Sequence, residues 1–382
     1  MKNVLLVFGG ESYEHDISIV TAFQIYKKTK LTDVKLHLLY ISRDGKFFLC
    51  DNKKISVLDL SRAEFKSSKK GLKEIVFVSG EKQKLFVKTR FGLKEILDAS
   101  VAIFACHGGD GENGKLVSFF EQQGIACSVG TSDALAVCMD KFLFKCFAKG
   151  INVPVVSGFK LSKSDFLNNK NYVGFRLSRM GFPVILKPNN GGSSIGLFIA
   201  KDIDEFFLKI KEAFEFDDEI IVEKFIEGAR EFNIAVLGDE KECSVSEIDE
   251  PIKKSEVLSF VDKYLSGDAK NAKGKGSMAY NLNQSLNLSD RVQAKMKNLA
   301  RKIFIELGLY GVVRIDFLYD EKQYKIYVCE VNAIPGSLAY YFFKKNRIVA
   351  NDLIENLIKI AQENFKKMHI NNSLVADILS EK

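Results

Sequence analysis

The sequence predicts an α/β fold whose C-terminal half is richer in antiparallel strands, and three observations support this prediction. Three short apolar runs have the composition of buried parallel strands: residues 2–8, 34–41 and 101–106. Ile19, Phe23 and Tyr26 recur at helical spacing between the first two runs, which indicates a β-α-β start. From Gly228 onwards, apolar strands alternate with tight polar turns, as in antiparallel hairpins.

The other elements follow from periodicity and turn signals. Helical periodicity covers residues 119–123, 133–149 and 201–216. Strands are expected at residues 183–187, 219–225, 232–237, 242–248, 312–319 and 324–331. Residues 43–98 are expected to form a partly extended insertion in the first domain, and residues 249–284 a long loop of a kind that is often functional.

The composition excludes several classes of protein. The chain has 382 residues, 46% hydrophobic and 27% charged, so it can bury a sizeable core and is not disordered as a whole. The net charge of +7 is spread along the chain, which weighs against a nucleic-acid partner. No apolar run suits a signal peptide or a membrane span, and the seven cysteines contain no C-x-x-C pair. We therefore expect a cytoplasmic protein with reduced thiols and no membrane partner.

A lysine at the end of a predicted strand precedes a loop rich in glycine and serine. The segment reads Lys187-Pro188-Asn189-Asn190-Gly191-Gly192-Ser193-Ser194-Ile195-Gly196. Small residues let backbone N–H groups approach phosphate oxygens, while the hydroxyls add donors and the lysine adds a positive charge. The pattern indicates a phosphate-binding loop, although a flexible structural turn has a similar composition.

Four polar residues lie in two consecutive predicted strands of the C-terminal half. Arg314 and Asp316 share one strand face, and Glu330 and Asn332 share a face of the next strand, because side chains alternate along a strand. A hairpin centred near Gln323 places Asp316 opposite Glu330, and a β-bulge would change that register. Two carboxylates beside an amide suit Mg²⁺, and Arg314 can stabilise oxyanionic charge. The alternative is a solvated polar face with an Arg–Glu pair.

Glycine-rich segments also follow two strands of the N-terminal part. Residues 9–15 and 107–115 lie at carboxyl ends of strands, where α/β proteins bind ligands. The second segment nearly matches a P-loop, but Leu116 replaces the Ser or Thr that would contact Mg²⁺. A Pro-Gly turn follows the last predicted strand, and the N–H group of Gly336 is a candidate oxyanion donor, although an ordinary turn needs the same residues.

Taken together, these segments resemble the D-alanine–D-alanine ligases of the ATP-grasp superfamily, in matching order from about residue 4 to residue 342. The resembling pieces are residues 8–18, 107–114, 139–141, 186–196, 223–226, 263–264, 314–316 and 330–336. The resemblance implies an ATP-grasp fold with an N-terminal Rossmann-like domain. The implied domains are residues 1–136, a central ATP-grasp subdomain at 137–226, and a C-terminal subdomain at 227–382 whose lid loop covers about 249–284.

The resemblance also implies where nucleotide and metal bind. The residues that match the ATP site of the family are Lys141, Lys187, Ser194, Glu223, Lys224, Phe225, Ile226 and Glu231. The residues that match the ligands of two Mg²⁺ or Mn²⁺ ions are Asp316, Glu330 and Asn332, in agreement with the strand-face argument.

For the amino-acid substrates, the resemblance implies a second set of residues. Glu14 matches the residue that holds the first ammonium group, with Ser193 and Tyr264 as its hydrogen-bonding partners. His107 and Glu112 match residues of the substrate pocket, and Lys263 matches the lysine near the second carboxylate. Arg314 and the Gly336 amide match the groups around the tetrahedral intermediate. Many family members have a serine near the second carboxylate where this chain has Tyr341, so either the Tyr341 or the Ser337 hydroxyl takes that place.

The implied reaction is the ATP-dependent joining of two D-alanines through a D-alanyl phosphate, for peptidoglycan precursor synthesis by a homodimeric enzyme. The pair Lys263 and Tyr264 favours a dipeptide product, because relatives that make D-alanyl-D-lactate tend to lack it. Two alternatives remain open at this point. One is the same fold with D-lactate or D-serine as acceptor, and the other is a non-catalytic nucleotide-sensing or nucleic-acid-binding protein.

Overall fold

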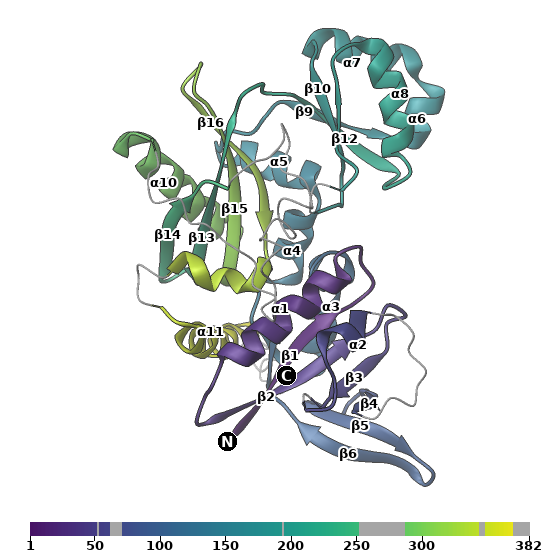
Figure 1. Cartoon of the computed structure of the whole chain (residues 1–382), viewed down its shortest axis with the longest axis vertical. Helices are drawn as coiled ribbons and strands as arrows, with labels where there is room; N and C mark the ends of the chain where they lie inside the picture. Colours follow the sequence, from purple (N-terminus) through teal and green to yellow (C-terminus); the bar gives the residue numbers. More distant parts are fainter. Residues whose placement is uncertain (52, 62–70, 193–194, 252–286, 344–347, 370–382) are drawn as a thin grey trace, which may run out of the picture.

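A computed structural model describes residues 1–382 except 52, 62–70, 193–194, 252–286, 344–347 and 370–382. Three sheets follow one another along the long axis of the molecule (Figure 1): an N-terminal sheet, a C-terminal sheet in the middle and a central-segment sheet at the far end. In the part of the chain that is described, no helix is both long enough and apolar enough to cross a membrane.

The N-terminal sheet has six strands in the order β4-β3-β2-β1-β7-β8. The parallel strands are β1 (Lys2–Gly9), β2 (Val34–Ile41), β7 (Val101–Phe104) and β8 (Ala126–Cys127). The antiparallel edge consists of β3 (Phe47–Cys50) and β4 (Leu72–Ile75). Helices α1 (His15–Lys28), α2 (Val57–Ser61) and α3 (Lys115–Gln122), the short helix η1 (Gly109–Gly111) and the hairpin β5 (Lys84–Thr89) and β6 (Gly92–Asp98) complete this part. The β-α-β start and the partly extended insertion are confirmed.

The predicted helix over residues 133–149 is in fact two helices. They are α4 (Ser132–Met139) and α5 (Lys141–Gly150). Asp140 between them has an extended backbone, and its side chain caps α5 by accepting a hydrogen bond from Leu143 N at 2.8 Å. Aspartate is a favoured N-cap residue because its carboxylate satisfies an N–H group that has no partner inside the helix. The break directs Lys141 at the first position of α5 towards the pocket described below.

The central-segment sheet is antiparallel, in the order β11-β10-β12-β9. Its strands are β9 (Gly158–Ser162), β10 (Val184–Pro188), β11 (Phe198–Ala200) and β12 (Glu219–Lys224). Helices α6 (Lys163–Asn168), α7 (Lys170–Met180) and α8 (Ile203–Ala213) cover one face of this sheet (Figure 1). The predicted strands at 183–187 and 219–225 and the helix at 201–216 are confirmed within one to three residues at each end.

The C-terminal sheet is also antiparallel, in the order β14-β13-β15-β16. Its strands are β13 (Arg230–Gly238), β14 (Cys243–Asp249), β15 (Gly311–Asp320) and β16 (Lys325–Asn332). It packs with α10 (Asp290–Glu306), η2 (Gly336–Phe343) and α11 (Ala350–His369). All four predicted strands of this half are confirmed.

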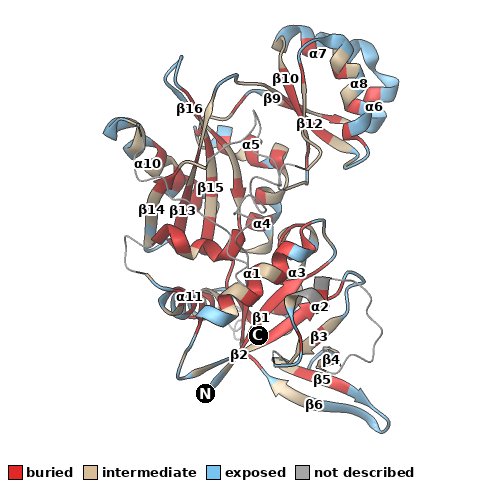
Figure 2. Ribbon diagram, viewed as in Figure 1, coloured by how far each residue is buried: buried red, intermediate tan, exposed pale blue. Residues whose placement is uncertain are grey.

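Two hydrophobic cores hold these layers together (Figure 2). The larger core runs from the N-terminal sheet into the C-terminal sheet, and α11 contacts strands of both sheets. The smaller core lies between the central-segment sheet and its helices. Because apolar burial is the main favourable term in folding, the N-terminal and C-terminal sheets form one packed body around the larger core. The central-segment sheet packs around the smaller core.

Candidate active site

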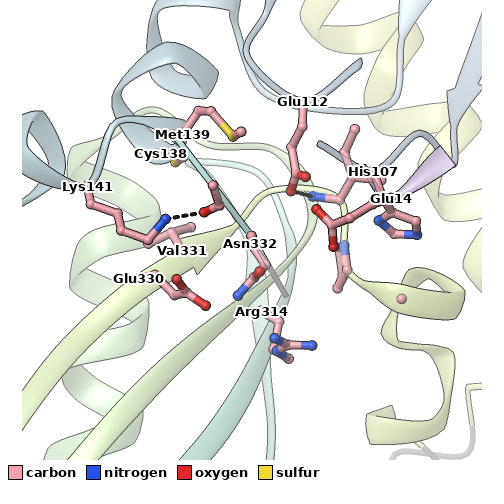
Figure 3. A pocket seen from close by; sticks show the side chains of 15 residues that line it. Glu14, His107, Glu112, Cys138, Met139, Lys141, Arg314, Glu330, Val331 and Asn332 are labelled. Carbon is pink, nitrogen blue, oxygen red and sulfur yellow. Dashed lines mark hydrogen bonds between the residues drawn. The ribbon is translucent and has the colours of Figure 1, made fainter. Parts of the chain in front are cut away.

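A pocket lies where the loops of the N-terminal sheet meet α4, α5 and the last strands of the C-terminal sheet. Figure 3 shows Glu14, His107 and Glu112 on one side of it and Lys141 and Glu330 on the other, with Asn332 between them. The lining residues are Glu14, His107, Glu112, Cys138, Met139, Lys141, Gly191, Gly192, Arg314, Glu330, Val331, Asn332, Ile334, Pro335 and Gly336. Most of the predicted substrate and metal residues that the structure describes therefore meet in one place.

The pairing of β15 with β16 brings the predicted metal ligands together. Asp316 is opposite Glu330, and Arg314 is opposite Asn332, as the hairpin argument predicts. The register shifts at a β-bulge between Asp316 and Phe317, because Phe317 pairs with Val328. The predicted pairing is thus confirmed at the pocket end of the hairpin, and it depends on the bulge.

Asp316 is held by charge and by an amide. Arg314 donates two hydrogen bonds to it, from Nε to Oδ1 at 2.7 Å and from Nη2 to Oδ2 at 2.8 Å. Asn332 Nδ2 donates to Asp316 Oδ2 at 3.1 Å. The bidentate contact of the guanidinium fixes the plane of the Asp316 carboxylate. It also offsets the negative charge of Asp316, which lies opposite the second carboxylate, Glu330. Arg314 therefore forms an ion pair with Asp316 within the same strand, β15.

Two lysines that are predicted to bind nucleotide lie on different elements, Lys141 on α5 and Lys187 on β10. Lys141 Nζ donates to the carbonyl oxygen of Gly191 in the glycine-serine loop (Figure 3). Lys187, at the end of β10, lies with its Nζ 2.9 Å from Glu223 Oε2 on β12. Burial alone would raise the pKa of Glu223, but the ammonium groups of Lys145 and Lys187 lower it to about 2. Glu223 is therefore ionised at neutral pH.

Glu14 joins three segments that are distant in sequence. Ser12 Oγ accepts a hydrogen bond from Glu14 N at 2.9 Å and donates one to the His107 carbonyl at 2.6 Å. A Cβ atom on Gly192 would lie 2.6 Å from Glu14 Oε2, so the loop after β10 contacts this carboxylate closely, and glycine is the residue that fits. The two N-terminal glycine-rich segments and the glycine-serine loop therefore meet at Glu14.

Glu112 connects the N-terminal loops to the turn after β16. Its Oε2 accepts a hydrogen bond from Gly108 N at 2.9 Å, and its Oε1 accepts one from Ile334 N at 3.2 Å. Burial, and then the charge of Glu14, raise the pKa of Glu112 to about 7 in spite of these two bonds. This carboxyl group therefore changes its charge near neutral pH.

His107 lines the same side of the pocket as Glu112 and is uncharged at neutral pH. Its Nε2 lies 2.9 Å from the Thr21 hydroxyl oxygen, and burial lowers its pKa to about 4. Thr21 Oγ1 also accepts a hydrogen bond from Ser337 N at 3.3 Å, and Ser337 Oγ donates to Gln24 Oε1 at 2.6 Å. This network holds the Gly336 turn against α1. Ser337 has a positive φ of 51°, an uncommon conformation that such contacts stabilise.

Some predicted site residues lie away from this pocket. Those outside its lining are Lys187, Glu223, Lys224, Phe225, Ile226, Glu231, Asp316, Ser337 and Tyr341. Asp316 contacts Arg314 and Asn332, which do line the pocket. Lys187 and Glu223 face each other at the end of the central-segment sheet, and Tyr341 is 3% exposed within η2. Ser193, Ser194, Lys263, Tyr264 and most of the predicted loop 249–284 lie outside the described residues.

Four residues of the site were not anticipated from the sequence. Thr21 and Gln24 support the Gly336 turn, Cys138 lines the pocket, and Lys145 pairs with Glu223. Only Lys145 had a visible signal, because it follows Lys141 by four residues and therefore shares its helix face. The other three depend on contacts between segments that no local pattern reveals.

Comparisons with known proteins agree with this geometry. A family model described as the D-ala D-ala ligase N-terminus matches residues 3–130, and one described as the D-ala D-ala ligase C-terminus matches residues 147–359. A D-alanine–D-alanine ligase of Helicobacter pylori (strain Shi470) is 30% identical over 377 residues, which cover 99% of each chain. A D-alanine–D-alanine ligase of Thermosipho africanus is 35% identical over 372 residues, or 96% of this chain and 95% of that one.

A solved structure extends the likeness to the fold. The D-alanine–D-alanine ligase of Coxiella burnetii superposes with a TM-score of 0.80 at 23% identity and covers 100% of this chain and 99% of its own. The family models together span well over half of the sequence. The chain therefore belongs to the D-alanine–D-alanine ligase family, and it is a ligase with an ATP-grasp fold.

Proposed function

We propose that this chain joins two D-alanines into D-alanyl-D-alanine through a D-alanyl phosphate. The γ-phosphoryl group of ATP is transferred to a carboxylate oxygen of the first D-alanine, which releases ADP. The amine of the second D-alanine then attacks the acyl carbon, the bond to phosphate breaks, and the amine loses a proton. The product is a building block of peptidoglycan, and family membership supports this reaction.

One observation carries this proposal for the described residues. Glu330 and Asn332 line a pocket whose opposite wall holds Glu14, and Asp316 pairs with Glu330 across the two strands. A carboxylate suits the ammonium group of an amino acid, whereas a carboxylate pair suits a metal–phosphate complex. Both kinds of ligand therefore have a place in one cavity, as a phosphoryl transfer to an amino acid requires.

The oxygen donors fit divalent ions. Asp316, Glu330 and Asn332 supply two carboxylates and an amide, and Asn332 keeps its amide oxygen for a cation because its nitrogen donates to Asp316. Hard oxygen donors of this kind prefer Mg²⁺ or Mn²⁺, and we propose that two such ions bind here with ATP. The bound ions would neutralise the charge of the phosphates.

We propose that lysines bind the phosphates of the nucleotide. We assign Lys141, Lys187 and Ser194 to the phosphates, because Lys141 Nζ donates to Gly191 in the glycine-serine loop and Lys187 lies at the end of β10, just before that loop. The end of β12, the segment after it and the start of β13 would supply the base and ribose contacts, through Glu223, Lys224, Phe225, Ile226 and Glu231. Backbone groups of an extended segment can hydrogen-bond the edge of a purine.

The substrate amino acids would lie between the two walls. Glu14, with Ser193 and Tyr264, would hold the first ammonium group, and Arg314 and the Gly336 N–H would stabilise the negative charge of the tetrahedral intermediate. The second D-alanine would lie beside His107 and Glu112. Its carboxylate would meet Lys263 and the hydroxyl of either Tyr341 or Ser337. The Ser337 hydroxyl already donates to Gln24, so it must exchange that bond to take this role.

The decisive experiment measures phosphate release from Mg-ATP with D-alanine, L-alanine or no amino acid, and identifies the product by mass. Release that requires D-alanine and yields D-alanyl-D-alanine supports the proposal. A product with D-lactate or D-serine at neutral pH would instead favour another acceptor. ATP turnover without any condensed product would contradict the ligation.

We further propose that the protein is a cytoplasmic homodimer. We propose that its domains are residues 1–136, 137–226 and 227–382.

A further inference from the structure

Lys145 is a buried lysine to which the proposed function assigns no ligand. It lies one turn after Lys141 on α5, and its side chain is 4% exposed. Its Nζ lies 2.6 Å from Glu223 Oε1 and donates to the Val156 carbonyl at 3.2 Å. A buried ammonium group is costly unless it is paired and hydrogen-bonded, and both conditions are met here. These contacts hold the side chain of Lys145 in place.

Lys145 also lies where the chain crosses between two sheets. Val156 belongs to the segment after α5, and Val328 N of β16 donates to the carbonyl of Pro154 in that segment at 2.8 Å. In Figure 1, α5 lies between the C-terminal sheet and the central-segment sheet. Lys145 is therefore held by Glu223 of the central-segment sheet and by the carbonyl of Val156 in the connecting segment. A side chain held in this way cannot move out to contact a ligand.

Lys187 is the partner that differs in exposure. Its Nζ lies 2.9 Å from Glu223 Oε2, and its side chain is 16% exposed compared with 4% for Lys145. The two oxygens of Glu223 are thus divided between two lysines. Without Lys145, Lys187 would be the remaining cation bound to a buried carboxylate, and moving it towards a phosphate would leave that carboxylate without a charge partner.

We propose that Lys145 is a positioning residue for nucleotide binding, which neutralises Glu223 so that Lys187 is available to the phosphates. Two cations and one anion in this cluster leave one positive charge for the ligand. The proposal rests on the proposed ATP site. It adds a role for a residue that contacts neither substrate nor nucleotide.

The first test replaces Lys145→Met and measures Kd for ATP, ADP and adenosine by calorimetry. We expect Kd to rise roughly tenfold for ATP and ADP and less than twofold for adenosine, because only the phosphates depend on the positive charge of Lys187. kcat at saturating ATP stays near the wild-type value, while KM for ATP rises. Lys149→Met on the exposed end of α5 is the matched control and leaves all three affinities unchanged. Lys145→Arg, which keeps the charge, restores most of the ATP affinity.

The second test removes the competing carboxylate. In a Glu223→Gln background, Lys187 no longer has a carboxylate at position 223 to neutralise, so it is available to the phosphates with or without Lys145. Lys145→Met should therefore change the ATP affinity less than twofold in that background. Glu223→Gln alone should raise the ratio of ATP affinity to adenosine affinity, a result that keeps the proposal testable if Lys145→Met does not fold. Equal losses for ATP and adenosine, or the same loss in both backgrounds, would overturn it. A wild-type chain that binds no ATP would overturn the proposed function instead.

Discussion

Asp316 lies opposite Glu330, although the strand register near the turn of the same hairpin, if continued, would place Cys329 opposite Asp316. Asp320 pairs with Lys325 and Phe317 with Val328, so continued regular pairing would place Cys329 beside Asp316. The bulge adds one residue to β16 and moves Glu330 into register. The two carboxylates of the proposed metal site therefore meet because of a local irregularity in the strand.

Glu330→Gln should weaken Mg²⁺ binding and lower turnover strongly, with little effect on folding. The amide keeps the size of the side chain but loses the negative charge that a divalent ion prefers. Titration of Mg²⁺ against ATP-dependent turnover and Mn²⁺ binding by magnetic resonance measure the two effects. Glu306→Gln, at an exposed position of α10, is the control. Unchanged turnover in Glu330→Gln would contradict the metal assignment.

Arg314→Lys should lower kcat by roughly 10- to 100-fold, although the charge is kept. Arg314 contacts both oxygens of Asp316, at 2.7 and 2.8 Å, and an ammonium group cannot reproduce this planar contact. Steady-state kinetics at saturating ATP and D-alanine, together with a melting curve, separate a catalytic loss from a folding defect. Activity within twofold of the wild type would show that charge alone is sufficient.

Gly192→Ala should raise KM for the first D-alanine more than KM for ATP. The new Cβ atom would lie 2.6 Å from Glu14 Oε2, so either the loop or the carboxylate must move. Gly174→Ala on α7 is a suitable control, because a Cβ atom there meets nothing within 4 Å. If the two KM values rise equally, the close approach of this loop to Glu14 does not govern the amino-acid site.

The stability of the protein should fall as pH rises through about 7, in part because of Glu112. Its pKa is raised by burial from 4.5 to about 7, so its contribution to stability is fully present below about pH 4.5 and is lost above about 7. Glu112→Gln should remove this dependence. The difference in unfolding free energy between variant and wild type should then shift in favour of the variant by about 2–3 kcal/mol between pH 5 and pH 8. Denaturant melts at both pH values test this, with the exposed Glu215→Gln as control.

The local elements of this protein were predictable because they depend on short-range patterns. The apolar runs of β1, β2 and β7, the helix between the first two, and the hairpin of β15 and β16 all follow from side-chain spacing. The polar residues at strand ends could also be named as site candidates. The break at Asp140 was missed because helical periodicity continues across it, although an N-cap residue stands there.

The sequence by itself determined which residues are candidates for the chemistry, because residue type and spacing within a strand or loop are local properties. Only the tertiary structure decided which of them share a cavity. Glu14 meets Gly192, and Glu112 accepts a bond from Ile334, across separations that no periodicity covers. The bulge at Cys329 and the division of Glu223 between Lys145 and Lys187 were likewise decided in three dimensions. The physical reason is that burial, charge pairing and register depend on packing between segments, and packing is settled only when the whole chain folds.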